Sequence, residues 1–217
     1  MSLRYRRLMS SYKKAVAGGW WLSGGISAAN CIAAYQPIGA ASYAASKTNL
    51  ANPGTYDATE GAAPDWDVVN GWDFINFQDY LITGITIQSG YSIIARFSNA
   101  NLSSTSTQAL SAHYNGASTQ RRLDILVRGV SVVKRYYAYG TSGQVTGGDS
   151  SASGVIAVTP TAGYFNGNSE VDLSSAAFTG SSDETMIIGG RRRSDTSGVD
   201  SRYEGYMQAF AVYKIDI

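Results

Sequence analysis

Two short carboxylate pairs have the residue types that hydrolytic chemistry uses. Asp65 and Asp67 flank Trp66, and Glu170 and Asp172 flank Val171. Hydrolysis of a glycosidic bond needs two carboxyl groups roughly 5–9 Å apart. Both pairs lie in turn-like stretches of the sequence, and the chain holds four glutamates in all. The pattern therefore leaves hydrolysis as an alternative and does not make it the leading interpretation.

The chain has few residues that could support nucleophilic or zinc-dependent catalysis. His113 is the one histidine, so a Ser-His-Asp triad would have to be built around it, and the sequence identifies no partners for it. Cys31 is the one cysteine, which excludes an intrachain disulfide and a cysteine-based zinc cluster. We expect Cys31 to be a small buried residue. The sequence predicts no catalytic residue, no metal site and no cofactor.

The strongest charge feature is the run Arg191-Arg192-Arg193, which is predicted to lie on a loop from Arg191 to Ser201. Three adjacent guanidinium groups could bind phosphate, an anionic polysaccharide or the carboxylates of a partner. The alternative is that acids close by in the sequence neutralise them. We do not expect specific nucleic-acid binding, because that needs phosphate contacts over a broad basic surface.

Aromatic side chains on predicted loops and strand faces are candidates for glycan contact. Sugar recognition uses aromatic rings against the apolar faces of sugars, with polar side chains supplying hydrogen bonds. The alternative for each residue is burial in the core or in a subunit interface. The candidates are Trp66, Trp72, Tyr114, Asn115, Tyr137 and Tyr203.

Composition and charge divide the chain into two parts. Only 15% of its 217 residues are charged, against roughly 25% in average globular proteins, which suits an assembled protein or a neutral ligand. Residues 1–19 hold five basic and no acidic residues, so residues 1–25 are predicted to be a basic docking arm. Residues 26–217 are predicted to form one domain. The candidate docking residues are Arg4, Arg6, Arg7, Lys13, Lys14, Trp20 and Trp21.

The N-terminal segment has no apolar run typical of a secretory signal, and no stretch is long enough to span a membrane. The basic arm could also be a solvated terminus. Its tryptophans could instead cover the sandwich of the same chain. The sequence does not decide between these alternatives.

The pattern of apolar residues predicts an all-β fold. From Gly71 onward apolar residues alternate with polar ones, and turn signals such as Asn115-Gly116 separate at least nine short strands. An Ala-rich stretch from Gly39 to Leu50 predicts a short helix. The predicted loops span Tyr56–Gly71 and Gly140–Gly154. Such a pattern indicates a β-sandwich or barrel.

Three motifs resemble the concanavalin A-like lectin/glucanase jelly roll, in its laminin-G-like branch. They are the segment from Phe74 to Leu81, the hairpin Tyr164-Phe165-Asn166-Gly167 ahead of Ile188-Gly189, and a final strand from Gly205 to Tyr213. Asn76 stands where the family has glycine. The segment from Ala33 to Gly54 also resembles lectin-like modules of phage and prophage structural proteins.

This resemblance implies an expected fold and a set of ligands. It implies a concanavalin A-like β-sandwich with a short Ala-rich helix and the basic arm. Glucanases of this superfamily carry two glutamates and an aspartate along one strand, and neither carboxylate pair here has the third member. Laminin-G-like domains often bind calcium at the sandwich rim. The rim acids here have no recognisable spacing, so calcium is not predicted; they are Asp73, Asp79, Asp183, Asp195 and Asp200.

The functional expectation from the sequence is a non-enzymatic, lectin-like subunit of a phage or virus-like particle. It would be assembled in the host cytoplasm as a homo-oligomer, contact other virion subunits through its arm, and bind cell-surface glycans through its loops. The alternatives are a stand-alone carbohydrate-binding module and a divergent glycoside hydrolase.

Overall fold

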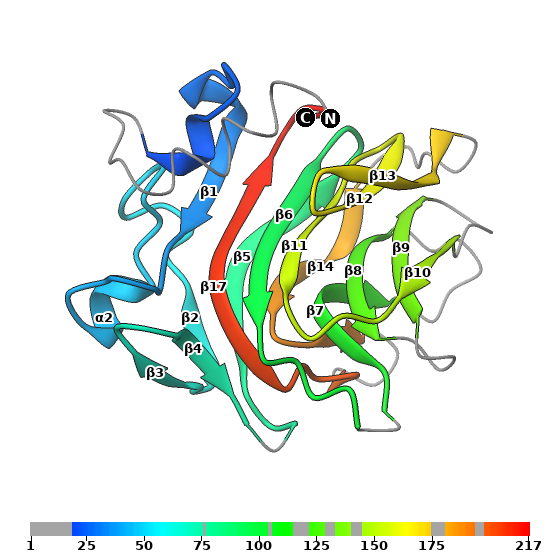
Figure 1. The fold of residues 1–217 in the computed structure, drawn as a ribbon. Helices are drawn as coiled ribbons and strands as arrows, with labels where there is room; N and C mark the ends of the chain where they lie inside the picture. The colour runs from blue at the N-terminus through cyan, green and yellow to red at the C-terminus, as the bar shows by residue number, and fades with distance from the viewer. Residues whose placement is uncertain are drawn as a thin grey trace.

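The computed structural model describes residues 19–217 except 76, 104–105, 115–121, 129–132, 140–144, 175–180 and 194–197. The described chain is mostly β-strand (Figure 1). In chain order the elements are η2 (Trp20–Leu22), η3 (Ala28–Asn30), β1 (Cys31–Tyr35), α2 (Tyr43–Ser46), β2 (Thr59–Ala62), β3 (Asp65–Asp67), β4 (Gly71–Phe74), β5 (Tyr80–Gln88), β6 (Ser92–Ser98), β7 (Gln108–Tyr114), β8 (Arg122–Arg128), β9 (Val133–Tyr139), β10 (Val145–Asp149), β11 (Gly154–Val158), β12 (Ala162–Phe165), β13 (Asn168–Asp172), β14 (Ser181–Ile188), β15 (Arg191–Arg193), β16 (Val199–Asp200) and β17 (Gly205–Tyr213).

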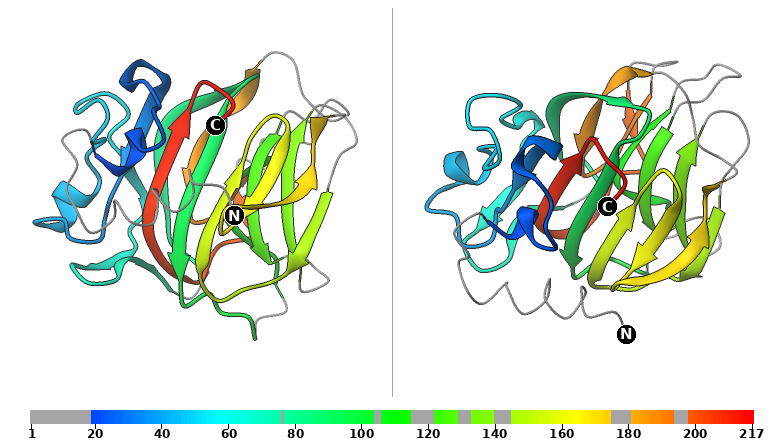
Figure 2. Two further views of the ribbon diagram at one scale, coloured as in Figure 1. Left: turned by 45° about the horizontal axis from the view of Figure 1, so that its top comes forward. Right: turned by 90° about the horizontal axis from the view of Figure 1, so that it is seen from above.

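Two layers of mainly antiparallel strands face one another (Figures 1 and 2). Among the described residues, the first layer has the order β13-β12-β11-β6-β17-β4-β3, and β1 also pairs with β17. The second layer holds β14-β5-β2 and, beside them, β10-β9-β8-β7 with β15 and β16. Backbone hydrogen bonds from Gly189 to Leu110 (2.8 Å) and from Ala112 to Gly190 (3.1 Å) join the two parts of this layer. The predicted all-β sandwich is confirmed.

The core lies between the layers and is built by period-two alternation. In β6 and β17 every second side chain points inward, and large aromatic rings fill the space. Tyr35 packs against Trp72 and Phe210, with ring centroids 6.1 and 6.5 Å apart. Phe74 and Phe97 pack edge-on against Tyr203. Buried aromatic rings of this size supply much of the hydrophobic stabilisation.

The outer face of β1 and β17 is covered by the start of the described chain. Cys31 and Tyr213 belong to a second apolar cluster against which Trp20 and Trp21 pack. The Tyr213 hydroxyl also donates to the Trp21 carbonyl oxygen (3.0 Å). The two tryptophans, predicted to dock a partner, therefore lie on their own sheet. Burial raises the pKa of the Cys31 thiol to about 12, so the thiol stays protonated.

Several predicted loops contain short strands. β2 and β3 lie within Tyr56–Gly71, β10 lies within Gly140–Gly154, and β15 and β16 lie within Arg191–Ser201. Two to five residues are too few for a periodic pattern, and the strands exist because neighbours supply pairing partners. The helix predicted from Gly39 to Leu50 is confined to α2, where the Ser42 side chain accepts from the Ala45 N–H (3.1 Å).

Asn49 connects β1 to the loop that follows α2. Its side chain is fully buried and accepts from the N–H of Ala34 (3.0 Å) and of Ala51 (3.0 Å). It also donates to the carbonyl oxygens of Ile32 (3.0 Å) and Thr55 (2.8 Å). A buried amide that satisfies this many backbone groups fixes the loop against the sheet.

We expect Asn49→Ala to lower the free energy of unfolding by roughly 2–4 kcal/mol, because buried backbone groups would lose their partners. Urea unfolding measures this change. Asn52→Ala, at an exposed position in the same loop, is the control and should stay within about 0.5 kcal/mol of the parent. Equal losses for the two variants would show that the buried amide has no special role.

Candidate functional site

The β3–β4 hairpin lies at one edge of the eight-stranded sheet (Figure 1, lower left). It carries the acidic residues Asp65, Asp67 and Asp73. Its turn is closed by Asp67, which accepts from the N–H groups of Val69 and Asn70 (both 2.7 Å). Gly71 follows with φ of +93°, and a Cβ there would collide with the Met207 carbonyl oxygen. The turn and the tight glycine together set the register of the two strands.

That register places aromatic residues on one face of the hairpin and carboxylates on the other. Trp66 lies opposite Trp72, and Asp65 lies opposite Asp73. Trp72 has no exposed surface and donates its indole N–H to the Ser46 hydroxyl (2.8 Å). Because successive residues of a strand point to opposite faces, the carboxylates lie on the outer face.

Asp65 and Asp73 are direct cross-strand neighbours, so their Cβ atoms lie about 5 Å apart. Burial raises the pKa of the half-buried Asp73 carboxyl, and the negative charges of Asp65, Asp67 and Asp79 raise it further. Burial also raises the pKa of Asp79, although the Ile75 N–H that it accepts (2.9 Å) opposes the shift. The outer face thus holds two carboxyls that retain protons more readily than ordinary aspartates.

Residues from α2 and β2 border this acidic face. Lys47 pairs with Glu60, and its ammonium lies 4.2 Å from the centre of the Tyr43 ring. The hydrogen bond from Lys47 lowers the pKa of Glu60. Burial raises the pKa of Tyr43, and Glu60, Asp79 and Asp65 contribute, so the phenol and these carboxylates belong to one electrostatic neighbourhood. We call Tyr43, Lys47, Glu60, Asp65, Asp73 and Asp79 the acidic face.

The second predicted carboxylate pair lies at the opposite edge of the same sheet, on β13. Glu170 makes an ion pair with Lys134 (3.2 Å), whose side chain also donates to the Asp149 carbonyl oxygen (2.5 Å). Lys134 is only 3% exposed, so Glu170 neutralises a buried cation. The Ser174 side chain lowers the pKa of Asp172, and the Ser174 N–H, from which Asp172 accepts (2.9 Å), lowers it further. Both members of this carboxylate pair, Glu170 and Asp172, are therefore bound to groups of their own chain.

The arginine run is paired within the chain at the two positions whose side chains are described. Arg191 makes a bidentate contact with Asp200 (2.6 and 2.8 Å), and Arg192 lies 3.3 Å from Glu184. The stretch is β15, which lies parallel to β7. The alternative of internal neutralisation holds for these two arginines. The Arg193 side chain lies outside the described part.

Three of the predicted glycan-contacting residues, Trp66, Trp72 and Tyr203, have side chains that the structure describes. Trp72 and Tyr203 are fully buried, so the prediction of glycan contact is wrong for both; the Tyr203 hydroxyl donates to the Ser98 carbonyl oxygen (3.1 Å). Trp66 is half-buried and donates to the Pro37 carbonyl oxygen (2.9 Å). For Tyr114, Tyr137 and His113 the structure describes only the strand backbone, and Asn115 lies outside the described residues.

Several further predictions fall outside the described residues: those for Arg4, Arg6, Arg7, Lys13, Lys14 and Asp195, and for the Asp183 side chain. Within the described part of the chain, no three His, Cys, Asp or Glu side chains are placed to hold a metal ion. None of the helices in that part is long and apolar enough to cross a membrane.

Sequence reasoning missed most of the acidic face. It singled out Asp65 and considered Asp73 and Asp79 only as rim acids. The signal was the alternation Trp72-Asp73-Phe74 beside Asp65-Trp66-Asp67, which places acids opposite one another once the two segments pair. Tyr43, Lys47 and Glu60 carried no comparable signal, because tertiary packing alone brings them there.

Comparison with solved structures connects this sandwich to glycoside hydrolases. A sialidase of Trypanosoma rangeli in complex with sialic acid matches 97% of this chain with a TM-score of 0.60 and 12% identity. A mutant of that sialidase displaying trans-sialidase activity matches 98% with a TM-score of 0.59 and 15% identity. The chain spans 36% of each sialidase. The chain is a concanavalin A-like β-sandwich.

A prokaryotic β-1,3-1,4-glucanase (lichenase) derived from a mouse hindgut metagenome also matches, over 63% of this chain and 72% of its own, with 16% identity and a TM-score of 0.40. No protein-family model and no curated protein sequence matches the chain.

These comparisons overturn the expected function. The two structures that match with TM-scores of 0.60 and 0.59 are both of a sialidase, which is an enzyme and not a phage or virion protein. The predictions of a non-enzymatic virion subunit and of no enzymatic activity are therefore wrong. The expectation of a phage protein came from the short motif between Ala33 and Gly54. In the structure this stretch holds the buried Asn49 side chain, which fixes the loop after α2 against β1. The alternative of a divergent glycoside hydrolase fits the findings better.

The raised pKa of Asp73 predicts a stability effect with a definite sign. Because the folded state favours the protonated carboxyl, the ionised group opposes folding above its folded pKa, and this penalty disappears below the ordinary aspartate pKa of about 3.9. We expect Asp73→Asn to be more stable than the parent at pH 7 and equal to it below about pH 4. Urea unfolding at both pH values measures this difference.

Asp172→Asn is the matched control, because its pKa is shifted in the opposite direction. This variant should be less stable than the parent at pH 7, and its loss should fade in acid. An Asp73→Asn variant that is less stable than the parent at pH 7 would contradict the raised pKa of Asp73.

Proposed function

We propose that this chain is a glycoside hydrolase whose reacting carboxylates are Asp65 and Asp73. The observation that carries the proposal is the cross-strand pairing of these residues on the outer face of β3 and β4. The sandwich provides the framework, in keeping with its likeness to the sialidases, which extends to fold alone. Asp65 is exposed and Asp73 is half-buried, so the two acids have different environments.

The two carboxyls take different parts in this proposal. Burial and the neighbouring carboxylates raise the pKa of Asp73, which is the direction of shift that a general acid needs to keep a proton for the leaving oxygen. Asp65 faces solvent beside it and serves as nucleophile. Directly opposed residues have Cβ atoms about 5 Å apart, so their carboxyls can approach the ~5 Å separation used by retaining glycosidases, whereas inverting enzymes need roughly 6.5–9.5 Å to admit a water. Retention of anomeric configuration is therefore the proposed outcome.

The chemical steps follow from this division. Asp73 transfers its proton to the glycosidic oxygen as the bond to the anomeric carbon breaks, while a carboxylate oxygen of Asp65 bonds to that carbon. Water, deprotonated by Asp73, then displaces Asp65 and restores both groups. The Lys47–Glu60 pair and the Tyr43 phenol border the site and can bind sugar hydroxyls.

A turnover assay tests the proposal with lichenan, laminarin, cello-oligosaccharides and 3′-sialyllactose as substrates. For whichever substrate is cleaved, Asp73→Asn and Asp65→Asn should each lower kcat by roughly 10²–10⁴-fold, because general acid–base catalysis contributes that range. Asp172→Asn, a carboxylate variant at the opposite sheet edge, should retain activity. NMR of the first product should show the retained anomer.

Two results would overturn the proposal. Unchanged turnover in both hairpin variants would remove these aspartates from catalysis. Binding of a glycan without turnover of any substrate would make the chain a carbohydrate-binding module.

A further inference from the structure

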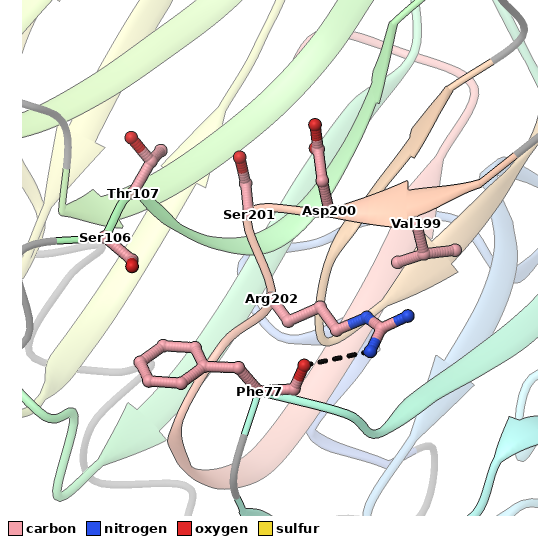
Figure 3. A pocket seen from close by; sticks show the side chains of 7 residues that line it. All are labelled: Phe77, Ser106, Thr107, Val199, Asp200, Ser201 and Arg202. Atoms are coloured by element: carbon pink, nitrogen blue, oxygen red, sulfur yellow. Dashed lines mark hydrogen bonds between the residues drawn. The ribbon is translucent and has the colours of Figure 1, made fainter. Parts of the chain in front are cut away.

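A hollow lies on the other side of the β4–β5 turn from the acidic face. It measures about 220 Å³ and is lined by Phe77 of that turn, Ser106 and Thr107 ahead of β7, and the segment from Val199 to Arg202 (Figure 3). Asp79 belongs to the same turn as Phe77, and the charge of Arg202 opposes the rise in the Asp79 pKa. The hollow and the acidic face are therefore neighbours that share one turn.

Two of its lining residues have backbone conformations that such residues rarely adopt. Phe77 has φ of +51° and Ser201 has φ of +45°. The left-handed region is unfavourable for a bulky aromatic residue and persists only where surrounding contacts impose it. Arg202 donates to the Phe77 carbonyl oxygen (2.9 Å), and the Ala109 N–H donates to the Ser201 carbonyl oxygen (2.7 Å). Strain of this kind concentrates at ligand-binding sites.

The charged groups at the hollow are engaged with the protein. Asp200 is held by Arg191 in a bidentate pair. The Arg202 guanidinium donates through one Nη atom to the Phe77 carbonyl oxygen and to the Gln78 side chain (both 2.9 Å), and it lies 5.8 Å from the centre of the Tyr80 ring. Its buried Nε has no hydrogen-bond partner among the described residues. An anionic or cationic ligand would compete with these contacts, so the hollow suits an uncharged one.

The remaining lining combines an aromatic ring with hydroxyl groups. In Figure 3 the Phe77 ring lies below Ser106, and Thr107 and Ser201 lie above it with their hydroxyls turned upward. A sugar ring matches this combination, because it has an apolar face that can stack on an aromatic ring and hydroxyls around its edge. At about 220 Å³ the hollow is smaller than ligand pockets of ~300–1,000 Å³, which suits one ring.

We propose that this hollow binds one uncharged sugar ring stacked on Phe77, as a subsite next to the acidic face. The choice of a carbohydrate rests on the proposed function, whereas the ring-sized, uncharged character rests on the hollow itself. A glycan that spans both would be fixed on one side of the β4–β5 turn and cleaved on the other.

The probes are the methyl glycosides of glucose, galactose and mannose, with glucuronate as the charged comparison. Titration into the full 217-residue chain, followed by amide NMR, should shift the signals of Ser106, Thr107 and Val199–Arg202 with at least one neutral glycoside. Glucuronate should bind at least tenfold more weakly. No shifts with any neutral glycoside, or tighter binding of glucuronate, would overturn the proposal.

Phe77→Asn separates the role of the ring from that of the backbone. Asparagine tolerates the left-handed region, so the variant should unfold at an equal or higher temperature while its affinity for the neutral glycoside falls at least tenfold. Tyr56→Asn is the matched control: Tyr56 has φ of +61° and is 44% exposed, and it does not line the hollow. It should relieve the same strain and leave affinity unchanged.

The two proposals fail in different ways. If the hairpin variants abolish turnover but Phe77→Asn changes neither glycoside affinity nor KM, the hydrolase stands and the subsite is wrong. If no substrate is cleaved but Phe77→Asn selectively removes binding, the subsite stands without the hydrolase. Equal loss of affinity in Phe77→Asn and Tyr56→Asn would also overturn the subsite.

Discussion

Burial of Trp72 is the constraint on which the acidic face depends. The indole ring fills the core beside Tyr35 and has no exposed surface. A shift of one residue in strand register would move every side chain to the other face, burying Asp73 and exposing the ring. The same ring binds Ser46, so α2 is held to β4. Tyr43 and Lys47 lie near the hairpin because their helix is attached at this point.

The acidic residues at the two edges of the eight-stranded sheet have different partners. At the β13 edge, Glu170 is matched to Lys134, and the pair closes the end of the sandwich. At the β3 edge, burial raises the pKa of Asp73, and repulsion from Asp65 and Asp79 raises it further. Groups whose pKa is shifted by burial and neighbouring charge concentrate at functional sites. Glu170 therefore stabilises the fold, whereas the ionised carboxyl of Asp73 opposes folding.

The long strands could be predicted because their own residues carry the alternation. The final strand, Gly205–Tyr213, agrees with the expected bounds, since it has enough residues for a period of two. The short strands β2, β3 and β15 could not be predicted, because pairing partners distant in the sequence create them. The acidic face likewise depends on strand pairing. The sequence singles out Asp65, but only the register of the hairpin makes Asp73 its partner. Positive φ at Phe77 has no sequence signature.

The tryptophans of this chain occupy two regions of the molecule. Trp20 and Trp21 cover the outer face of β1 and β17, while Trp66 and Trp72 form the inner side of the hairpin that carries the acids. The two pairs have different surroundings. Only Trp66 and Trp72 lie on the hairpin that carries the proposed reacting carboxylates. Intrinsic fluorescence can therefore be dissected by replacing the outer pair, which turns the hairpin into an optical reporter of whatever binds above it.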